Sequence, residues 1–253
     1  MKPATLEVGS RVALLKRNAF FRGLDDGTLE GIAPKFFQRE YKRRDYVWFQ
    51  GDPSDAFVVI RDGYVKIVKH SKGGKDVLLE VLGPGDVLGA VALLEGRPYP
   101  ATACALSKAS LLLLSRDEFL GVIERNPAVV TQALVAVGSR LRYAHEMMRQ
   151  FATECVESRV ASLLLILGSR AFDEHGERVV LDVRLTRRDI ADMVGAALET
   201  TIRLLSRWEK NGVVSRDRGH IVLLDLPTLR KISSEESYPK EYDPSHIASD
   251  TRR

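Results

Sequence analysis

The first half of the chain alternates short apolar runs with turns rich in glycine and aspartate. The apolar runs cover residues 56–60, 65–69, 77–82 and 111–114. The turn Arg61-Asp62-Gly63 separates the first two runs, and Gly83-Pro84-Gly85-Asp86 follows the third. Glycine adopts positive φ without steric cost, so such clusters are typical of corners between short strands. The pattern predicts a compact antiparallel β-roll or jelly roll between about Phe20 and Ser115.

The middle of the chain carries a heptad pattern. After Asn126-Pro127, a typical helix start, apolar residues recur at alternating steps of four and three: Val130, Leu134, Val137, Leu141, Ala144, Met148 and Phe151. Such a narrow apolar stripe is typical of a helix that pairs with a second helix. We therefore expect a long dimerisation helix at a two-fold axis. A helix that packs on its own roll is the alternative.

The last third begins with a predicted helix over residues 156–169 and a predicted strand over Val179–Leu185. The segment Thr186-Arg187-Arg188-Asp189 then has the form of an N-terminal helix cap and opens a short helix that ends at Val194. Gly195-Ala196-Ala197 predicts a turn. These features predict the first helix and the turn of a helix-turn-helix motif.

The second helix of this motif is predicted over Leu198–Asn211, with Gly212 as its stop. A β-hairpin follows, with strands at residues 213–216 and 220–224 and a turn at Asp217-Arg218-Gly219. The hairpin makes this a winged helix-turn-helix.

The two faces of the second helix differ in chemistry. Residues at i, i+3, i+4 and i+7 spacing predict a buried stripe of Thr201, Leu204, Leu205 and Trp208. The opposite face carries Leu198, Glu199, Ile202, Arg203 and Ser206. An arginine can donate two hydrogen bonds to guanine, and a glutamate can accept one from cytosine. The alternative for Glu199 and Arg203 is a salt bridge on a solvated helix.

The context favours the reading of bases over the salt bridge. Leu198 and Ile202 are poor neighbours for water but good contacts for thymine methyl groups. Between Arg184 and His220, eight basic residues stand against five acidic ones. The expected partner is double-stranded DNA with a roughly palindromic site, and arginines beside the reading face would contact phosphates. The predicted DNA-binding residues are Thr186, Arg187, Leu198, Glu199, Thr200, Ile202, Arg203, Ser206, Arg207 and Arg218.

Composition adds limits rather than a function. The chain has 253 residues, 45% hydrophobic and 28% charged, which excludes a mostly disordered or fibrous protein. Its net charge of +4 permits an anionic partner without requiring one. The sequence contains no apolar stretch of membrane-spanning length and starts without a signal peptide pattern, so we expect no membrane partner. Cys104 and Cys155 cannot form a disulfide framework, which favours a cytoplasmic protein.

A β-roll with glycine corners, a dimerising helix and a winged helix-turn-helix, in that order, resemble the CRP/FNR family of bacterial transcription regulators. The most specific stretches are residues 51–57, 82–86, 185–191 and 199–203. The resemblance implies an α+β fold, a jelly-roll-like sensor, no enzymatic activity, and RNA polymerase as a partner if the protein activates. The expected divisions are an N-terminal helical segment (1–19), the sensor (20–125), the dimerisation helix (126–152), the winged helix-turn-helix (153–231) and a polar, disordered tail (232–253).

In this family, Glu199 and Arg203 match the residues that read a G·C-containing half-site. The sensor departs from the family pattern. Cyclic-nucleotide binders of the family carry Gly-Glu for the ribose where this chain has Gly89-Ala90. They carry an Arg-Ser or Arg-Thr pair for the phosphate where this chain has Tyr99-Pro100-Ala101. The Thr-Ser pair that would meet adenine falls near Ala144-His145.

Each missing group removes a charge-assisted or polar hydrogen bond, so we predict that cyclic AMP is not the effector through the usual contacts. The predicted effector pocket is apolar and comprises Leu88, Gly89, Ala90, Tyr99, Pro100, Ala101, Ala144 and His145. A hydrophobic metabolite, a gas bound through haem, or no ligand at all are the alternatives left open.

This chain also lacks the residues that other sensors of the family use to bind their cofactors. No cysteine precedes Cys104, so no iron–sulfur cluster of the FNR type is expected. The haem-binding CO sensors place Cys and His where this chain has Gly89 and Val91, which leaves His70 or His145 as candidate haem ligands. Both cysteines are expected to be inert thiols, with a redox switch as the alternative.

Two other function classes compete. A metal-dependent enzyme built on the roll would need clustered His and Glu ligands, and His70 is the only histidine there. An interaction module would use its helix-turn-helix for packing alone. We favour a dimeric, sequence-specific regulator whose effector repositions two reading helices about 34 Å apart.

Overall fold

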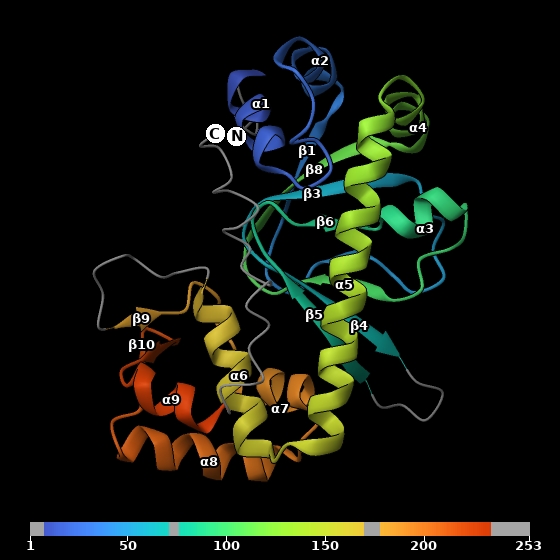
Figure 1. The fold of residues 1–253 in the computed structure, drawn as a ribbon. Coiled ribbons are helices and arrows are strands. Elements are labelled where there is room, and N and C mark those ends of the chain that lie inside the picture. The colour runs from blue at the N-terminus through green and yellow to red at the C-terminus, as the bar shows by residue number, and fades with distance from the viewer. Residues whose placement is uncertain (1–7, 71–75, 170–177, 234–253) are drawn as a thin grey trace. The chain divides into compact units, whose positions relative to one another are not determined.

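The computed structural model describes residues 8–70, 76–169 and 178–233. They belong to two compact units, residues 1–138 and 139–253, and the long helix α5 (Pro127–Thr153) contributes to both. Figure 1 shows the strands of the first unit and the short helices of the second. The heptad segment is therefore one continuous helix, as its pattern predicts.

The first unit contains two antiparallel four-stranded sheets, which confirms the predicted α+β fold with a β-roll. One sheet has the strand order β1-β8-β3-β6 and the other has the order β2-β7-β4-β5. The strands are β1 (Phe37–Tyr41), β2 (Tyr46–Trp48), β3 (Ala56–Asp62), β4 (Val65–His70), β5 (Asp76–Leu82), β6 (Val87–Leu88), β7 (Thr102–Ala105) and β8 (Ala109–Ser115). The four apolar runs noted in the sequence form β3, β4, β5 and β8.

Strand β3 is apolar on both faces because it separates two cores. Successive side chains of a strand point to opposite faces. Phe57 and Val59 join a core that includes Phe21 and Phe119, whereas Val58 and Ile60 join the interior of the roll. The rings of Phe57 and Phe119 stack with their centroids 4.1 Å apart. Burial on both faces explains why this run does not alternate with polar residues.

The predicted turn between β3 and β4 requires its glycine. Gly63 has φ of 81°, in the left-handed region. A Cβ at this position would lie 2.1 Å from the carbonyl oxygen of Lys108, on the neighbouring loop. A side chain here would therefore force two loops apart as well as strain the backbone.

Short helices complete the first unit. They are α1 (Val8–Arg17), α2 (Asp26–Ile32), the 3₁₀ helix η1 (Ala33–Lys35), α3 (Ala90–Glu95) and α4 (Arg116–Arg125). Asp25 caps α2 and Ser115 caps α4 through side-chain oxygens. Leu29 of α2 and Phe119 of α4 are fully buried in the same core. These helices therefore close the face of the first sheet that Phe57 points to.

The second unit contains α6 (Val156–Ser169), α7 (Arg187–Val194), α8 (Leu198–Lys210) and α9 (Leu226–Ile232). A small sheet has the order β10-β11-β9, formed by β10 (Val214–Asp217), β11 (His220–Leu223) and β9 (Val179–Val180). Helix α9 ends at Ile232, and Ser233 is buried beside it. The rest of the predicted polar tail lies outside the described residues.

The predicted strand over Val179–Leu185 is wrong in its length. Only Val179 and Val180 form β9, which pairs with Leu223 and Val222 of β11. Leu181, Val183 and Leu185 are still buried at every second position. The alternation thus reports burial on one side of an extended segment, whereas a strand also needs a hydrogen-bonding neighbour.

Candidate nucleic-acid interface

Helix α7 begins at a complete capping box. Thr186 accepts a hydrogen bond from the backbone N–H of Asp189 at 3.1 Å, and Asp189 accepts one from the backbone N–H of Thr186 at 3.0 Å. Gly195 ends the helix with φ of 62°. The cap and the glycine fix where the first helix starts and where the chain turns.

Helix α8 buries the predicted stripe. Thr201, Leu204, Leu205 and Trp208 are all buried, with relative exposures of 6% or less. The indole N–H of Trp208 donates to Glu157 of α6 at 3.1 Å. The stripe therefore attaches α8 to its own domain and sets which face looks outward.

The opposite face of α8 is open to solvent. Glu199, Ile202, Arg203, Ser206 and Arg207 are exposed, while Leu198 and Thr200 are half-buried. In the part of the chain that the structure describes, no ion pair joins Glu199 to Arg203. Both side chains therefore keep their hydrogen-bonding groups for an external partner. Ile202 adds an apolar residue of 38% exposure between them.

Two of the predicted phosphate contacts are held by carboxylates. Arg187 donates from Nη2 to Glu209 Oε2 at 3.2 Å, and Arg216 of the wing lies 3.5 Å from the same carboxylate. Arg207 forms an ion pair with Glu157 at 2.6 Å. Sequence reasoning missed both glutamates as partners, because they lie 22 and 50 positions from these arginines.

The wing carries Arg218 at the tip of its turn. Arg218 has φ of 48°, an uncommon value for a residue other than glycine, and it is exposed. Beside the turn, Arg184 donates from Nε to Nε2 of His220 at 3.0 Å. The other ring nitrogen of His220 therefore carries the proton and donates to the carbonyl of Leu181 at 2.7 Å. This chain of contacts ties the wing to the segment before α7.

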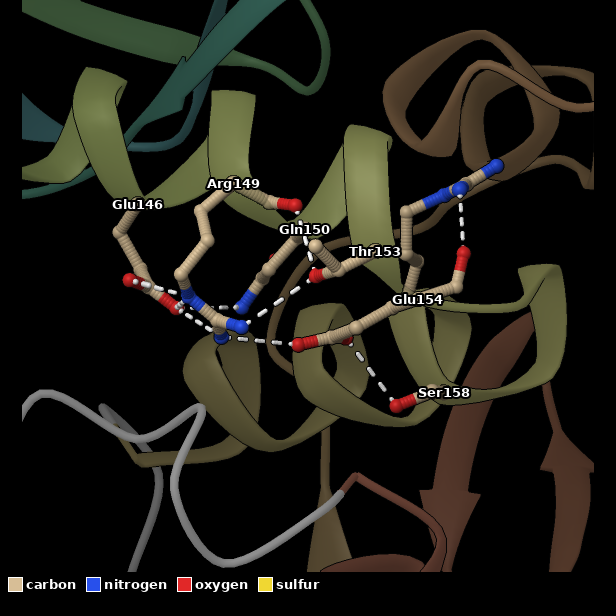
Figure 2. Close-up of polar contacts among 7 residues, drawn as sticks. Glu146, Arg149, Gln150, Thr153, Glu154 and Ser158 are labelled. Atoms are coloured by element: carbon tan, nitrogen blue, oxygen red, sulfur yellow. Dashed lines mark hydrogen bonds and ion pairs between the residues drawn. The ribbon is translucent and has the colours of Figure 1, made fainter.

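A polar network joins the end of α5 to α6 (Figure 2). Arg149 donates to Glu146 at 2.6 Å on its own helix and to Glu154 at 3.0 Å beyond the helix end. Glu154 also accepts a hydrogen bond from Ser158, and its carbonyl accepts one from Arg159. Arg159 in turn donates to the carbonyl of Val194, the last residue of α7. Hydrogen bonds thus connect the end of the long helix to the turn of the helix-turn-helix.

The predicted dimerisation stripe on α5 is exposed wherever its side chains are described. Leu134 is 68% exposed, the largest value among these apolar residues. Val130, Val137, Leu141, Ala144 and Met148 are exposed as well. The side chain of Phe151 lies outside the described residues.

The predicted effector positions in the roll are packed. Tyr99 is 5% exposed, its ring stacks on Trp48 with centroids 4.0 Å apart, and its hydroxyl donates to the carbonyl of Ala56. Gly89 has φ of 73°, and a Cβ there would lie 2.7 Å from the Tyr99 ring. Leu88, Ala90 and Ala101 are buried, whereas Pro100 is exposed. Sequence reasoning missed Trp48, which lies 51 positions before Tyr99.

Burial also changes the acidity of Tyr99. Loss of water around the ring raises the pKa of the phenol above its usual range, and the nearby carboxylates of Asp55 and Asp52 act in the same direction. The hydrogen bond to Ala56 opposes this rise. The phenol is therefore a neutral group in the roll and carries no charge for a ligand.

The predicted haem ligands and cysteines lie in different surroundings. His70 on β4 and His145 on α5 are exposed, Cys155 is exposed, and Cys104 is buried in β7. Among the described residues, no three His, Cys, Asp or Glu side chains are grouped as metal ligands would be. Within the same residues, none of the helices is both long enough and apolar enough to span a membrane.

Comparison with protein families assigns a domain to each half. The family model of the cyclic nucleotide-binding domain matches residues 38–126. The model of the Crp-like helix-turn-helix domain matches residues 158–232.

Relatives of similar length match almost end to end. The CRP-like cAMP-activated global transcriptional regulator of Mycobacterium tuberculosis is 25% identical over 86% of this chain and 97% of its own. The cyclic AMP receptor protein of Thermus thermophilus is 28% identical over 87% of this chain and 98% of its own.

The same fold is seen in the structure of FixK2 from Bradyrhizobium japonicum. That structure has a TM-score of 0.69 and 23% identity, and covers 79% of this chain and 98% of its own. The chain belongs to the CRP/FNR family, and it is a DNA-binding transcription regulator, not an enzyme, with a cyclic nucleotide-binding domain followed by a Crp-like helix-turn-helix domain.

Proposed function

We propose that the protein is a homodimeric, sequence-specific regulator that reads DNA through the outward face of α8, and that its effector is not cyclic AMP bound through the usual contacts of the family. The observation that carries the first part is the outward placement of Glu199 and Arg203, with Thr201 and Trp208 turned into the domain. One glutamate and one arginine a helical turn apart suit adjacent cytosine and guanine edges in a major groove.

Dimerisation is supported by the exposed stripe on α5. Large apolar side chains such as Leu134, Leu141 and Met148 are exposed at heptad spacing. An exposed row of this kind is stabilised when a second helix covers it, and a two-fold axis then duplicates α8. Two reading helices would fit half-sites about one helical turn of DNA apart.

The effector part of the proposal rests on the packing around Tyr99. The two relatives above are named for cyclic AMP, so this nucleotide is the first effector to test. In this chain the positions expected to meet its ribose and phosphate carry Ala90 and a buried, stacked Tyr99. Neither supplies the charged hydrogen bonds that a cyclic phosphate requires. The same packing supports a ligand-independent regulator as a second candidate.

The network of Figure 2 supports a route between a dimerising α5 and the reading helix. Arg149 and Glu154 brace the junction after α5, and Arg159 connects that junction to Val194 at the end of α7. We expect a change in α5 to reach the end of α7, and the turn before α8, through these hydrogen bonds.

Selection from a palindromic DNA library, followed by fluorescence anisotropy, tests the DNA-binding part. We expect one preferred palindrome for the wild type and a loss of about tenfold to hundredfold in affinity for it in Arg203→Ala, because a bidentate base contact is lost. Arg230→Ala removes an exposed arginine from α9, outside the proposed reading face, and is the matched control. If Arg203→Ala binds the selected site as well as wild type, the reading role of this face is wrong.

Absorption spectroscopy, native mass spectrometry and thermal unfolding with cyclic AMP test the effector part. We expect a dimer without a Soret band and no rise in Tm at millimolar cyclic AMP, since a ligand that binds the native state raises Tm. A Soret band would establish haem-based sensing, and a clear Tm shift would establish cyclic AMP as a ligand. A bound small molecule in the mass spectrum would identify the effector directly.

A further inference from the structure

The carboxylate of Glu209 lies between two arginines from different elements. Its two oxygens accept from Nη2 of Arg187 at 3.4 and 3.2 Å, and Nε of Arg216 lies 3.5 Å away. Glu209 is in the last turn of α8, Arg187 is the first residue of α7, and Arg216 is in β10. One side chain thus joins both helices of the motif to the wing.

Both arginines are held close to the domain. The side chains of Arg187 and Arg216 are 35% and 30% exposed. Nε of Arg187 is buried without a hydrogen-bond partner, so the guanidinium is held where not all its donors are satisfied. Glu209 engages Nη2 of Arg187, and a phosphate oxygen would compete for this donor.

The carboxylate opposes any phosphate that approaches this cluster. It repels the phosphate directly, and it occupies donors that the phosphate would use. The cluster of two arginines and one glutamate has a surplus of one positive charge, whereas the arginines alone would offer two. Contacts to phosphate carry no sequence information, so the restraint lowers chiefly the affinity for DNA on which no base contact fixes the position of Arg187 relative to the phosphates.

We propose that Glu209 is a positioning residue that sets DNA specificity by restraining Arg187 and Arg216 from indiscriminate contact with phosphates. The inference rests on the proposed DNA-binding face, because it requires Arg187 to lie near a phosphate. When α8 binds its preferred site, a backbone phosphate lies beside Arg187. Its oxygens then replace Glu209 as the acceptor for some of the guanidinium N–H groups. On random DNA the register is poor, and the carboxylate keeps both arginines.

The second carboxylate beside α8 is not equivalent. Glu157 pairs with Arg207, but it also accepts a hydrogen bond from the indole of Trp208, a residue of the buried stripe. Arg207 is 56% exposed and can swing toward solvent. Truncating Glu157 would therefore also remove the acceptor of a buried indole, whereas truncating Glu209 acts mainly on two arginines.

Glu209→Gln tests the proposal because it keeps a hydrogen-bond acceptor and removes the charge. The full-length protein is titrated by anisotropy with a random-sequence duplex and with its selected palindrome, between about 50 and 200 mM salt. We expect several-fold tighter binding to the random duplex, a smaller gain on the palindrome, and a log K against log salt slope steeper by about one unit on random DNA. The ratio of specific to random affinity therefore falls.

Three controls separate the proposed role from others. Glu124→Gln on α4 makes the same change in net charge and should leave the salt slope unchanged. Glu209→Asp keeps the charge and should keep the wild-type slope, even if packing loosens. In an Arg187→Ala/Arg216→Ala background, Glu209→Gln should have no further effect on the slope, as expected when one residue acts through the others.

An unchanged slope and random-duplex affinity in Glu209→Gln would overturn the inference, and so would weaker binding to random DNA. Thermal unfolding of each variant shows that folded protein is being compared. If the wild type binds no DNA at all, the proposed function is wrong. If the wild type binds DNA but Glu209→Gln has the same salt slope, only the role proposed for Glu209 is wrong.

Discussion

The outward face of α8 and the effector positions of the roll differ in the exposure and bonding of their side chains. Arg203 and Glu199 are exposed and carry no structural partner among the described residues. Tyr99 is buried, stacks on Trp48 and bonds to the backbone of Ala56. Both regions were identified by position within the same family pattern, yet only one of them leaves polar groups open to a partner.

The difference indicates which region the fold depends on. Exposed side chains without intramolecular contacts contribute little to the stability of the free protein, whereas buried aromatic side chains contribute much. Substitutions in the two regions should therefore separate cleanly into effects on function and effects on stability.

The largest expected effect is on the free energy of unfolding, at the buried Tyr99 of the roll. Tyr99→Ala leaves a cavity beside Trp48 and removes a buried hydrogen bond, so we expect the free energy of unfolding to fall by about 3 kcal/mol. Arg203→Ala on the exposed face should change it by less than about 0.5 kcal/mol. Urea denaturation of both variants measures the difference. Similar values for the two would show that Tyr99 is not part of the core.

A somewhat smaller effect is expected on α5, whose exposed stripe is apolar rather than charged. Leu141→Asp should shift the protein from dimer to monomer in sedimentation velocity, because burying one leucine contributes about 2 kcal/mol and a buried charge is costly. Affinity for a palindromic duplex should fall with it. Arg142→Asp, one position along, is the control. A Leu141→Asp protein that stays dimeric would contradict the proposal that the stripe on α5 forms the dimer interface.

The third prediction concerns the buried side of α8 in the DNA-binding domain. Substitutions there should lower the stability of the protein, as those in the roll do. Glu157→Ala leaves the indole N–H of Trp208 without its acceptor, so we expect a loss of about 1–2 kcal/mol in unfolding free energy. Glu157→Gln keeps the acceptor and should cost less. Denaturation curves of the two variants decide, and equal losses would mean that charge rather than the hydrogen bond matters.

The smallest effect concerns one helix cap in each unit. Asp25 and Asp225 both have a pKa below the usual 3.8, first because of the side-chain hydrogen bond from Thr28 and Thr228, respectively. A lowered pKa in the folded state favours folding above pH 3.8, and this contribution is lost as the pH falls through the folded-state value. NMR titration should show that Thr228→Val raises the pKa of Asp225 and leaves that of Asp25 unchanged. Equal movement of both would contradict a local cause.

Much of the fold could be predicted because its elements have local patterns. The strands β3, β4, β5 and β8, the helices α5 to α8 and the hairpin of the wing lie within a few residues of their predicted bounds. Helices α2, α4 and α9 were not predicted, although Asp25, Ser115 and Asp225 cap them. These helices have about two or three turns each, too few for a clear period in the sequence.

The amino-acid order alone predicts which face of α8 is apolar, where the turns around it lie and which polar groups the roll lacks. Periodicity and turn chemistry are local properties, so they can be read along the chain. Three features appear only in the folded chain: Tyr99 stacks on Trp48, Glu209 contacts both Arg187 and Arg216, and β9 stops at Val180. Each of these depends on residues distant in sequence meeting in space, and no local pattern encodes which distant partner a side chain will find.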